Sequence, residues 1–423
     1  MVVQWREPKK NSAKNIMRNI SIGIDIGTRT TRVVVGEFQR GEKPARPDTR
    51  LNESFGQDSV HSGGNPKIIG VGEAPTRGLR HGYVSDFTPA VDSVKKAVAM
   101  AEKSSGMKIK RAFVGVSGTS LRGESSSGSA IISKADGEVT TLDINKALED
   151  AEDNLNLNNK KVIQVYPISY RLDGKDVQGR LEGMRGTKLE VKALFVTYSI
   201  QHLEDLVGVI ASAGVETIDV IATPIALSHI VLTERQKIVG VALVDIGAET
   251  TSLAVFENGT LTSIQTFSIG SANITNDIAL GLKISLDEAE NLKLGNTEAN
   301  FSKKKLEEII EARLTDIFES VENHLRKIKR AELLPAGVIF VGGGANTFGL
   351  LELSRSTLKL PSTTGSSEIF GNAKTKLRDA SWFTALGLII SGKDNSNYSD
   401  NSFVNLFKDL KSALKSSARQ LMP

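Results

Sequence analysis

Two acidic residues begin the same short motif twice in this chain. The sequence GIDIGTRTTRVVV at residues 23–35 returns as LVDIGAETTSLAVF at residues 243–256, so Asp25 and Asp245 stand 220 positions apart. Between Asp25 and Glu37, seven of thirteen positions match their counterparts. In each copy an apolar, β-branched run leads to the acidic residue and another follows a short turn, which predicts a β-hairpin. A carboxylate beside such a turn is suited to holding Mg²⁺, usually through water, next to a phosphate.

The two turns would supply the hydroxyls and backbone amides that bind phosphate oxygens. We expect Asp25 to orient Mg²⁺ or its waters while its turn meets the β- and γ-phosphates of a nucleoside triphosphate. Asp245 would be the opposing carboxylate on the other side. The candidate phosphate contacts are Gly27, Thr28, Arg29 and Thr30 in the first turn and Gly247, Ala248, Glu249 and Thr250 in the second.

A third candidate element is the sequence VIFVGGGANTFGL, in which an apolar strand ends at Gly342, Gly343 and Gly344 and a helix is expected to begin. Glycine lets a backbone approach a ligand closely, and a helix N-terminus favours electronegative groups. Either motif is also a common structural sequence when it stands alone. We favour ligand binding because both hairpins and this turn occur in one chain, in this order.

The elements that must position these motifs alternate between strands and helices, which predicts an α/β protein. A chain of 423 residues is long enough for two or more units. We predict a basic flexible tail at 1–19, a first subdomain from 20–103 and 187–217, an inserted α+β unit at 104–186, a second subdomain from 218–272 and 336–392, a small helical/β subdomain at 273–335, a polar linker at 391–402 and a terminal helix at 403–423.

Composition excludes several classes of protein. The net charge is only +4, which does not suggest wholesale nucleic-acid binding. Without cysteine the chain has no disulfide, thiolate zinc site or cysteine nucleophile, and five scattered histidines argue against a histidine-rich metal site. No apolar run reaches the length of about 18 residues that a membrane-spanning helix needs.

The last 21 residues predict a helix that lies on a membrane surface. Its apolar side chains fall on one stripe, and basic side chains lie on or beside the polar face. Each cation near an anionic lipid surface contributes about 1 kcal/mol. Docking of this helix on the protein itself or on a partner is the alternative, which the preceding polar linker disfavours. The stripe holds Phe403, Leu406, Phe407, Leu410, Leu414, Ala418 and Leu421, and the cations are Lys408, Lys411, Lys415 and Arg419.

The ordered set of two acidic hairpins and a glycine-rich turn resembles the actin-like ATPase superfamily. Within it, the chain resembles the bacterial FtsA cell-division family across residues 20–392 and the terminal helix. The resemblance implies an α/β, actin-like (ribonuclease H-like) two-lobed ATPase fold with an inserted SHS2-like subdomain and a C-terminal amphipathic helix. The more specific segments are RGLRHGYVSDF (77–87), VYPISYRLDG (165–174), GMRGTKLEVKALFVT (183–197), VLTERQKIVGVALVDIG (231–247) and NITNDIALGLKISLDEAENLK (273–293).

The resemblance also implies a function. It predicts ATP and Mg²⁺ as ligands, with Glu290 and Lys293 reaching the ribose and adenine, although a solvated ion pair is the alternative for these two residues. It predicts self-assembly into filaments through the inserted subdomain, and a contact with the tubulin-like protein FtsZ near residues 273–335. Other divisome membrane proteins and anionic lipid are further expected partners, at the cytoplasmic face of the membrane and at the division septum.

Departures from the superfamily pattern concern hydrolysis. Ala248 and Glu249 occupy a turn that is glycine-rich in many relatives, and Glu249 would bring negative charge near a polyanion. Hydrolytic relatives carry an acidic or amide residue where this chain has Thr223 before Pro224, and threonine is no general base near neutral pH. We therefore expect weak or no ATPase activity, with Asp25, Asp245 and, weakly, Thr223 as the catalytic candidates.

Two other functions remain open from the sequence. A pilus-assembly scaffold resembling PilM would share the ATP-binding fold, but the amphipathic tail and the 183–197 segment disfavour it. A sugar kinase or phosphatase of the superfamily would need a catalytic acid or base beside the nucleotide. Thr223 at the expected position argues against that enzyme class.

Overall fold

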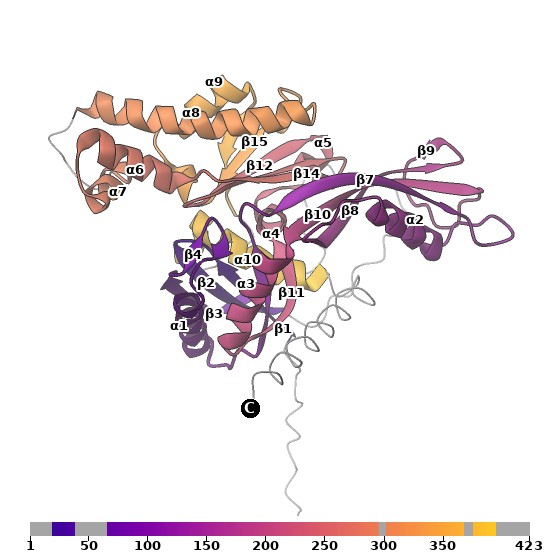
Figure 1. The fold of residues 1–423 in the computed structure, drawn as a ribbon, viewed down its shortest axis with the longest axis horizontal. Helices are drawn as coiled ribbons and strands as arrows, with labels where there is room; N and C mark the ends of the chain where they lie inside the picture. The colour runs from indigo at the N-terminus through magenta and orange to yellow at the C-terminus, as the bar shows by residue number, and fades with distance from the viewer. Residues whose placement is uncertain (1–18, 39–65, 296–301, 368–374, 395–423) are drawn as a thin grey trace, which may run out of the picture.

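The computed structural model describes residues 19–38, 66–295, 302–367 and 375–394 (Figure 1). The predicted terminal helix at 403–423 and nearly all of the predicted basic tail lie outside the described residues. The predicted linker begins inside them, because residues 391–394 still belong to a helix.

The first lobe contains a five-stranded sheet with the strand order β11-β6-β1-β2-β3. Strands β1, β2 and β3 run antiparallel, and β6 and β11 continue the sheet in parallel. Helices α1 and α3 pack against this sheet. The bounds are β1 (Asn19–Ile26), β2 (Thr30–Phe38), β3 (Lys67–Pro75), α1 (Phe87–Ser105), β6 (Arg111–Val116), α3 (Ile200–Ser212) and β11 (Glu216–Ala222), with the short hairpin β4 (Leu79–Arg80) and β5 (Tyr83–Val84) before α1.

The second lobe repeats this topology. Its strands β14, β13 and β12 are antiparallel, and β15 and β16 continue in parallel, so the two sheets have equivalent strand orders. The repeated sequence motif is therefore a repeated fold. The bounds are β12 (Val241–Ile246), β13 (Thr251–Glu257), β14 (Thr260–Phe267), α6 (Ser271–Leu282), α7 (Leu286–Lys293), α8 (Lys303–Lys327), β15 (Val338–Val341), α9 (Leu350–Leu358) and β16 (Ser362–Thr364).

The helices of the second lobe share one core with its sheet. Ile274 and Ile278 of α6 and Phe318 of α8 are fully buried in the same cluster as Val244 and Phe340 of β12 and β15. In the described part of 273–335 this core is covered by helices, and no strand accompanies them, whereas a mixed helical/β unit was predicted.

An inserted unit projects from the two lobes (Figure 1). Its strands continue the second-lobe sheet in the order β14-β7-β10-β8-β9, although β14 and β7 share one pair only, Gln265 with Arg122. Helix α2 packs on β7 and β10. The bounds are β7 (Arg122–Ile131), α2 (Thr141–Asp153), β8 (Lys160–Leu172), β9 (Lys175–Val177) and β10 (Lys188–Ser199).

The observed strand pairing moves the expected limits of this insertion. Strand β6 falls inside the range 104–186 but pairs with β1 and β11 in the first lobe. Strand β10 falls after that range but pairs with β7 and β8 in the insertion along its whole length. The insertion therefore starts and ends later along the chain than predicted, because strand partners distant in sequence decide which unit a strand joins.

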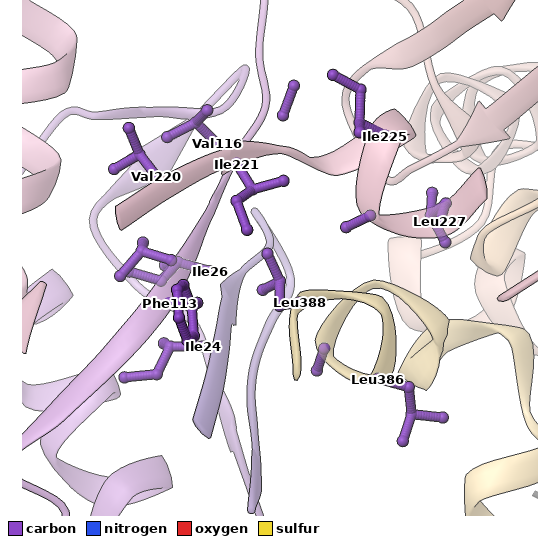
Figure 2. Packing of buried hydrophobic residues seen from close by; sticks show 14 of the residues in the cluster. Ile24, Ile26, Phe113, Val116, Val220, Ile221, Ile225, Leu227, Leu386 and Leu388 are labelled. Atoms are coloured by element: carbon purple, nitrogen blue, oxygen red, sulfur yellow. The ribbon is translucent and has the colours of Figure 1, made fainter. Parts of the chain in front are cut away.

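Two consecutive helices carry the chain from the first lobe to the second. Helix α4 (Thr223–Val231) follows β11 of the first lobe, and α5 (Glu234–Val239) connects it to β12 of the second. Helix α10 (Phe383–Asp394) packs on α4 and on β1 (Figure 2). A Cβ atom added to Gly387 would lie 2.0 Å from the Ala226 carbonyl oxygen, and one added to Gly23 would lie 2.6 Å from that of Ala385. Glycine thus permits the close contact of α10 with both neighbours.

Candidate functional site

The two repeated turns have the same hydrogen-bond geometry. The Gly27 amide donates to the Thr30 carbonyl at 3.2 Å, and the Gly247 amide donates to the Thr250 carbonyl at 2.8 Å. Asp25 pairs across its hairpin with Arg32, and Asp245 pairs with Ser252, again 220 positions later. Both acidic residues lie at the ends of central strands, as the repeat predicted.

Asp25 and Asp245 are both buried carboxyl groups with raised pKa values. Burial raises the pKa of Asp25 to about 6, against the opposing effect of the nearby Arg32 guanidinium. Burial also raises the pKa of Asp245 to about 7, and the negative charge of Asp25 contributes to this increase. A buried carboxylate whose ionisation is disfavoured by a second carboxylate is suited to a cation placed between the two or bound through water.

Several polar groups beside these carboxylates lack a partner in the protein. The Thr223 hydroxyl is buried and accepts or donates no hydrogen bond among the described residues. The Thr223 side chain lies across Gly115 from Asp25, because a Cβ atom added to Gly115 would be 3.1 Å from Thr223 Cγ2 and 3.7 Å from Asp25 Oδ1. Within the described part of the chain, the amides of Thr28 and Ala248 also donate to no acceptor. These groups fit an oxygen-rich ligand and its waters.

The three glycines after β15 have different roles. Gly342 has a φ of 83°, and an added Cβ atom would lie 2.2 Å from Asp245 Oδ1. A Cβ atom on Gly344 would lie 2.3 Å from the Ile246 side chain, whereas one on Gly343 would meet nothing within 4 Å. Gly342 and Gly344 thus allow close packing on β12, and only Gly343 presents backbone to open space.

The α-helix predicted after these glycines begins later along the chain than expected. Residues 343–346 form one 3-10 turn, and α9 begins only at Leu350, after Gly349 with a φ of 75°. The left-handed conformation at Gly349 breaks the helical path. The N-terminus of α9 is therefore separated from the triple-glycine turn by the segment 347–349.

Glu290 and Lys293 form a buried ion pair rather than a solvated one. Their carboxylate and ammonium groups are 2.8 Å apart, with side-chain exposures of 16% and 6%. Thr275 donates to Glu290 at 2.5 Å and accepts from Lys293 at 2.9 Å. Burial disfavours the Glu290 carboxylate, but these hydrogen bonds outweigh it and lower its pKa.

Arg29 connects the first turn to this group in the other lobe. Its guanidinium donates to Glu290 Oε1 at 2.9 Å. The first turn, α6 and α7 therefore meet in one place. Arg313, in contrast, pairs with Asp277 at 2.6 Å and has a structural role on α8.

Glu249 has a partner that sequence reasoning missed. The backbone amide of His81, in the β4–β5 turn of the first lobe, donates to Glu249 Oε2 at 2.6 Å. His81 Nδ1 also lies 3.3 Å from the Glu249 carbonyl oxygen. The segment 77–87 that contains His81 was singled out by its sequence, but its link to Glu249 had no signal in the sequence.

Neither a metal-binding cluster nor a membrane-spanning helix occurs among the described residues. They hold no group of three or more histidine or acidic side chains that could bind a metal ion. A cation bound by Asp25 and Asp245 would thus take its other ligands from phosphate and water. No helix in the described ranges is long and apolar enough to cross a bilayer. The predicted membrane contacts Phe403, Leu406, Phe407, Leu410, Leu414, Lys408, Lys411 and Lys415 lie outside those ranges.

Comparison with known proteins gives matches over most of the chain. The family model "Cell division protein FtsA" matches residues 242–387, and "SHS2 domain inserted in FTSA" matches residues 118–197. Cell division protein FtsA of Bacillus subtilis is 31% identical over 390 residues, covering 87% of this chain and 82% of that protein. The protein of that name from Pseudomonas aeruginosa is 28% identical, covering 88% of both chains.

A solved structure shares the fold at low sequence identity. A chain of the PilM-PilN type IV pilus biogenesis complex matches with a TM-score of 0.63 and 16% identity, covering 88% of this chain and 98% of that one. Such low identity shows the fold alone. Together with the equivalent sheets of the two lobes and the SHS2 match, it confirms the predicted two-lobed actin-like α/β fold with an inserted subdomain.

Proposed function

The chain belongs to the FtsA family of cell division proteins, and we propose that it binds Mg–ATP between its two lobes and tethers the FtsZ ring to the cytoplasmic membrane. The observation that carries the nucleotide proposal is the pair of equivalent turns whose aspartates, Asp25 and Asp245, are costly to ionise because they are buried, with the charge of Asp25 adding to the cost for Asp245. A bound divalent cation would relieve that cost.

Each group near the turns has a proposed task. Asp25 and Asp245 hold the waters of Mg²⁺, which when bound neutralises the phosphate charge. The free amides of Thr28 and Ala248 donate to phosphate oxygens, and the open backbone at Gly343 lets the nucleotide approach closely. Glu290 and Lys293, ordered by Thr275, bind the ribose and adenine.

Hydrolysis is proposed to be weak. The unpartnered Thr223 hydroxyl beside Asp25 can hold a water molecule, but it cannot take a proton from that water near neutral pH. Asp25 and Asp245 are occupied by the cation in this arrangement. ATP would therefore act mainly as a ligand that fixes the two lobes and supports assembly.

The membrane and partner proposals rest on the sequence and the family. The amphipathic stripe and cations of residues 403–423 support binding to anionic lipid at the cytoplasmic face of the septal membrane. We place the FtsZ contact on the α6–α8 region and filament assembly on the inserted unit. Other divisome membrane proteins are further proposed partners.

A fluorescent ATP analogue tests the nucleotide site. Titration in the presence of Mg²⁺ should show binding by the wild-type chain and at least about tenfold weaker binding by Asp245→Asn, since one cation ligand loses its charge. Glu257→Gln is the matched control, because Glu257 lies at the far end of β13 and pairs with Arg330. Equal affinity of all three proteins would rule out the proposed site.

Liposome co-sedimentation tests the membrane proposal. The full chain should sediment with vesicles that contain anionic lipid, and should bring FtsZ with it. A chain ending at residue 396 should lose both effects, and replacing Lys408, Lys411 and Lys415 by alanine should weaken binding to anionic vesicles more than to neutral ones. Lipid binding that survives the truncation, or no recruitment of FtsZ by the full chain, would contradict the proposal.

A further inference from the structure

The short β4–β5 hairpin lies where three parts of the molecule meet. On one side the His81 amide donates to Glu249 Oε2 of the second-lobe turn at 2.6 Å. The hairpin itself belongs to the first lobe and precedes α1. On its other side it contacts the chain segments that enter and leave the inserted unit. Residues 79–84 are therefore placed to connect the nucleotide turn with the insertion.

Contacts with the entering segment are close. A Cβ atom added to Gly82 would lie 2.4 Å from Gly118 Cα, and one added to Gly118 would lie 2.6 Å from the His81 carbonyl oxygen. The Thr119 amide donates to that same oxygen at 3.3 Å. Gly82 and Gly118 have φ values of 85° and 106°, so their backbones meet without side chains between them. Strand β7 of the insertion begins just afterwards, at Arg122.

Contacts with the leaving segment complete the junction. The hydroxyl of Tyr198, near the end of β10, donates to the Ser117 carbonyl at 2.7 Å and lies 3.3 Å from that of Gly82. The ring of Tyr83 stacks on that of His202 with centroids 4.8 Å apart. A hydrogen bond of 2.9 Å joins His202 Nδ1 and the Ser120 hydroxyl. Both chain crossings into the insertion are thus tied to the hairpin.

The second-lobe turn that receives the His81 amide is also anchored on its own side. The amides of Ser271 and Ala272, at the start of α6, donate to the Gly247 and Ala248 carbonyls at 2.9 and 2.8 Å. Helix α6 also carries Thr275, which orders Glu290 and Lys293. Displacement of Glu249 would therefore be transmitted to both the phosphate turn and the proposed ribose site.

We propose that Glu249 is a positioning residue that links the two lobes and transmits closure around the nucleotide to the inserted unit through the β4–β5 hairpin. This inference rests on the proposed nucleotide site and assigns a role to the 77–87 segment within it. The inference also explains why a phosphate-binding turn carries a carboxylate. The negative charge of Glu249 accepts a hydrogen bond from a backbone amide of the first lobe. Opening of the lobes must break this charge-assisted hydrogen bond.

Hydrogen–deuterium exchange of the full chain without nucleotide tests the link itself. Glu249→Ala should increase exchange of peptides covering 79–84 and 117–121 by about tenfold, equivalent to about 1.4 kcal/mol of local opening. Glu249→Gln, which keeps an oxygen acceptor, should give a smaller increase. Glu257→Ala, which removes a partly buried carboxylate from the other end of β13, should leave both peptides unchanged.

The kinetics of a fluorescent ATP analogue test the coupling to nucleotide. Glu249→Ala should accelerate dissociation about tenfold with little change in association, since an open lobe pair releases ligand faster. Unchanged exchange at 79–84, or an equal effect of Glu257→Ala, overturns the proposal. If Glu249→Ala does not fold, the exchange and dissociation rates of Glu249→Gln decide instead. Absence of binding by the wild-type chain would instead refute the nucleotide site, whereas the exchange result would still report on the link.

Discussion

At the scale of single residues, the positions of the two aspartates suit a ligand but lower the stability of the ligand-free protein. Each lies at the end of a central strand, and burial raises the pKa of both above the usual value of 3.8. The folded protein therefore holds protons that the unfolded chain releases. The free energy of unfolding should fall as pH rises from about 4 to about 7, the range between the unfolded and folded pKa values.

Asp245→Asn should consequently stabilise the nucleotide-free protein. Removing the buried charge and its repulsion with Asp25 is expected to raise the free energy of unfolding by at least about 1 kcal/mol at pH 8. The gain should shrink as pH is lowered to 5, where the wild-type carboxyl is already protonated in the folded state. Thermal unfolding at the two pH values measures this. A loss of stability at pH 8, or a gain independent of pH, would contradict the assigned cause.

At the scale of elements, the start of α2 is fixed by one buried carboxylate in the inserted unit. Asp143 accepts hydrogen bonds from the Ser133 amide, the Thr140 amide and the Thr140 hydroxyl, at 2.9, 2.9 and 2.6 Å. Burial opposes its ionisation, but these hydrogen bonds outweigh burial and hold the pKa below its usual range. The hydrogen bond from Ser133 joins α2 to the chain just after β7, the strand on which α2 packs.

Asp143→Ala should destabilise the inserted unit by about 2–3 kcal/mol, because it removes a buried acceptor that serves three partly buried hydrogen bonds. Urea unfolding followed by a probe in the insertion measures this. Since the folded pKa is depressed, the contribution of Asp143 is present above about pH 4 and is lost as pH falls further. Asp153→Ala, an exposed position on the same helix, is the control and should change stability by less than about 0.5 kcal/mol. Equal effects of the two variants would refute the role of Asp143.

At the scale of the whole molecule, helix α4 contacts the sheets of both lobes, and α10 packs on α4. Helix α10 lies against both β1 and α4, and at Gly387 no Cβ atom fits against the Ala226 carbonyl. Arg29 and Glu249 add polar contacts from lobe to lobe at the proposed nucleotide site. The relative position of the lobes is thus set by tight backbone packing on one side and by breakable polar contacts on the other.

Gly387→Ala should separate α10 from α4 and destabilise the protein by about 1–3 kcal/mol through overpacking. Helix propensity alone would favour alanine by about 1 kcal/mol, so the predicted sign is opposite to that of an ordinary helical glycine. Gly208→Ala in α3 is the matched control, because its added Cβ atom would meet the Phe87 ring only at 3.4 Å. Thermal unfolding should show a decrease for the first variant and no decrease for the second. A stabilising Gly387→Ala would show that the helix contact can relax.

The sequence alone determined the features that depend on neighbours along the chain. Alternating β-branched residues and small turns specify a hairpin locally, so the repeat at Asp25 and Asp245 predicted two equivalent hairpins, and the structure contains both. The apolar stripe of 403–423 is equally local, and its membrane role stays a prediction. The resemblance in segments such as 77–87 and 273–293 predicted the family that the comparisons then showed.

Only the tertiary structure decided the features that depend on distant partners. Strand β6 joined the first lobe because β1 and β11 offer it parallel edges, which moved the insertion relative to its predicted limits. Gly342 and Gly343 read alike in the sequence, yet one packs on Asp245 and the other faces open space. Glu249 bonds a backbone amide 168 positions away, and Arg29 reaches Glu290 across 261 positions. Such contacts exist because folding brings the two lobes together. Local patterns of polarity in the sequence do not predict them.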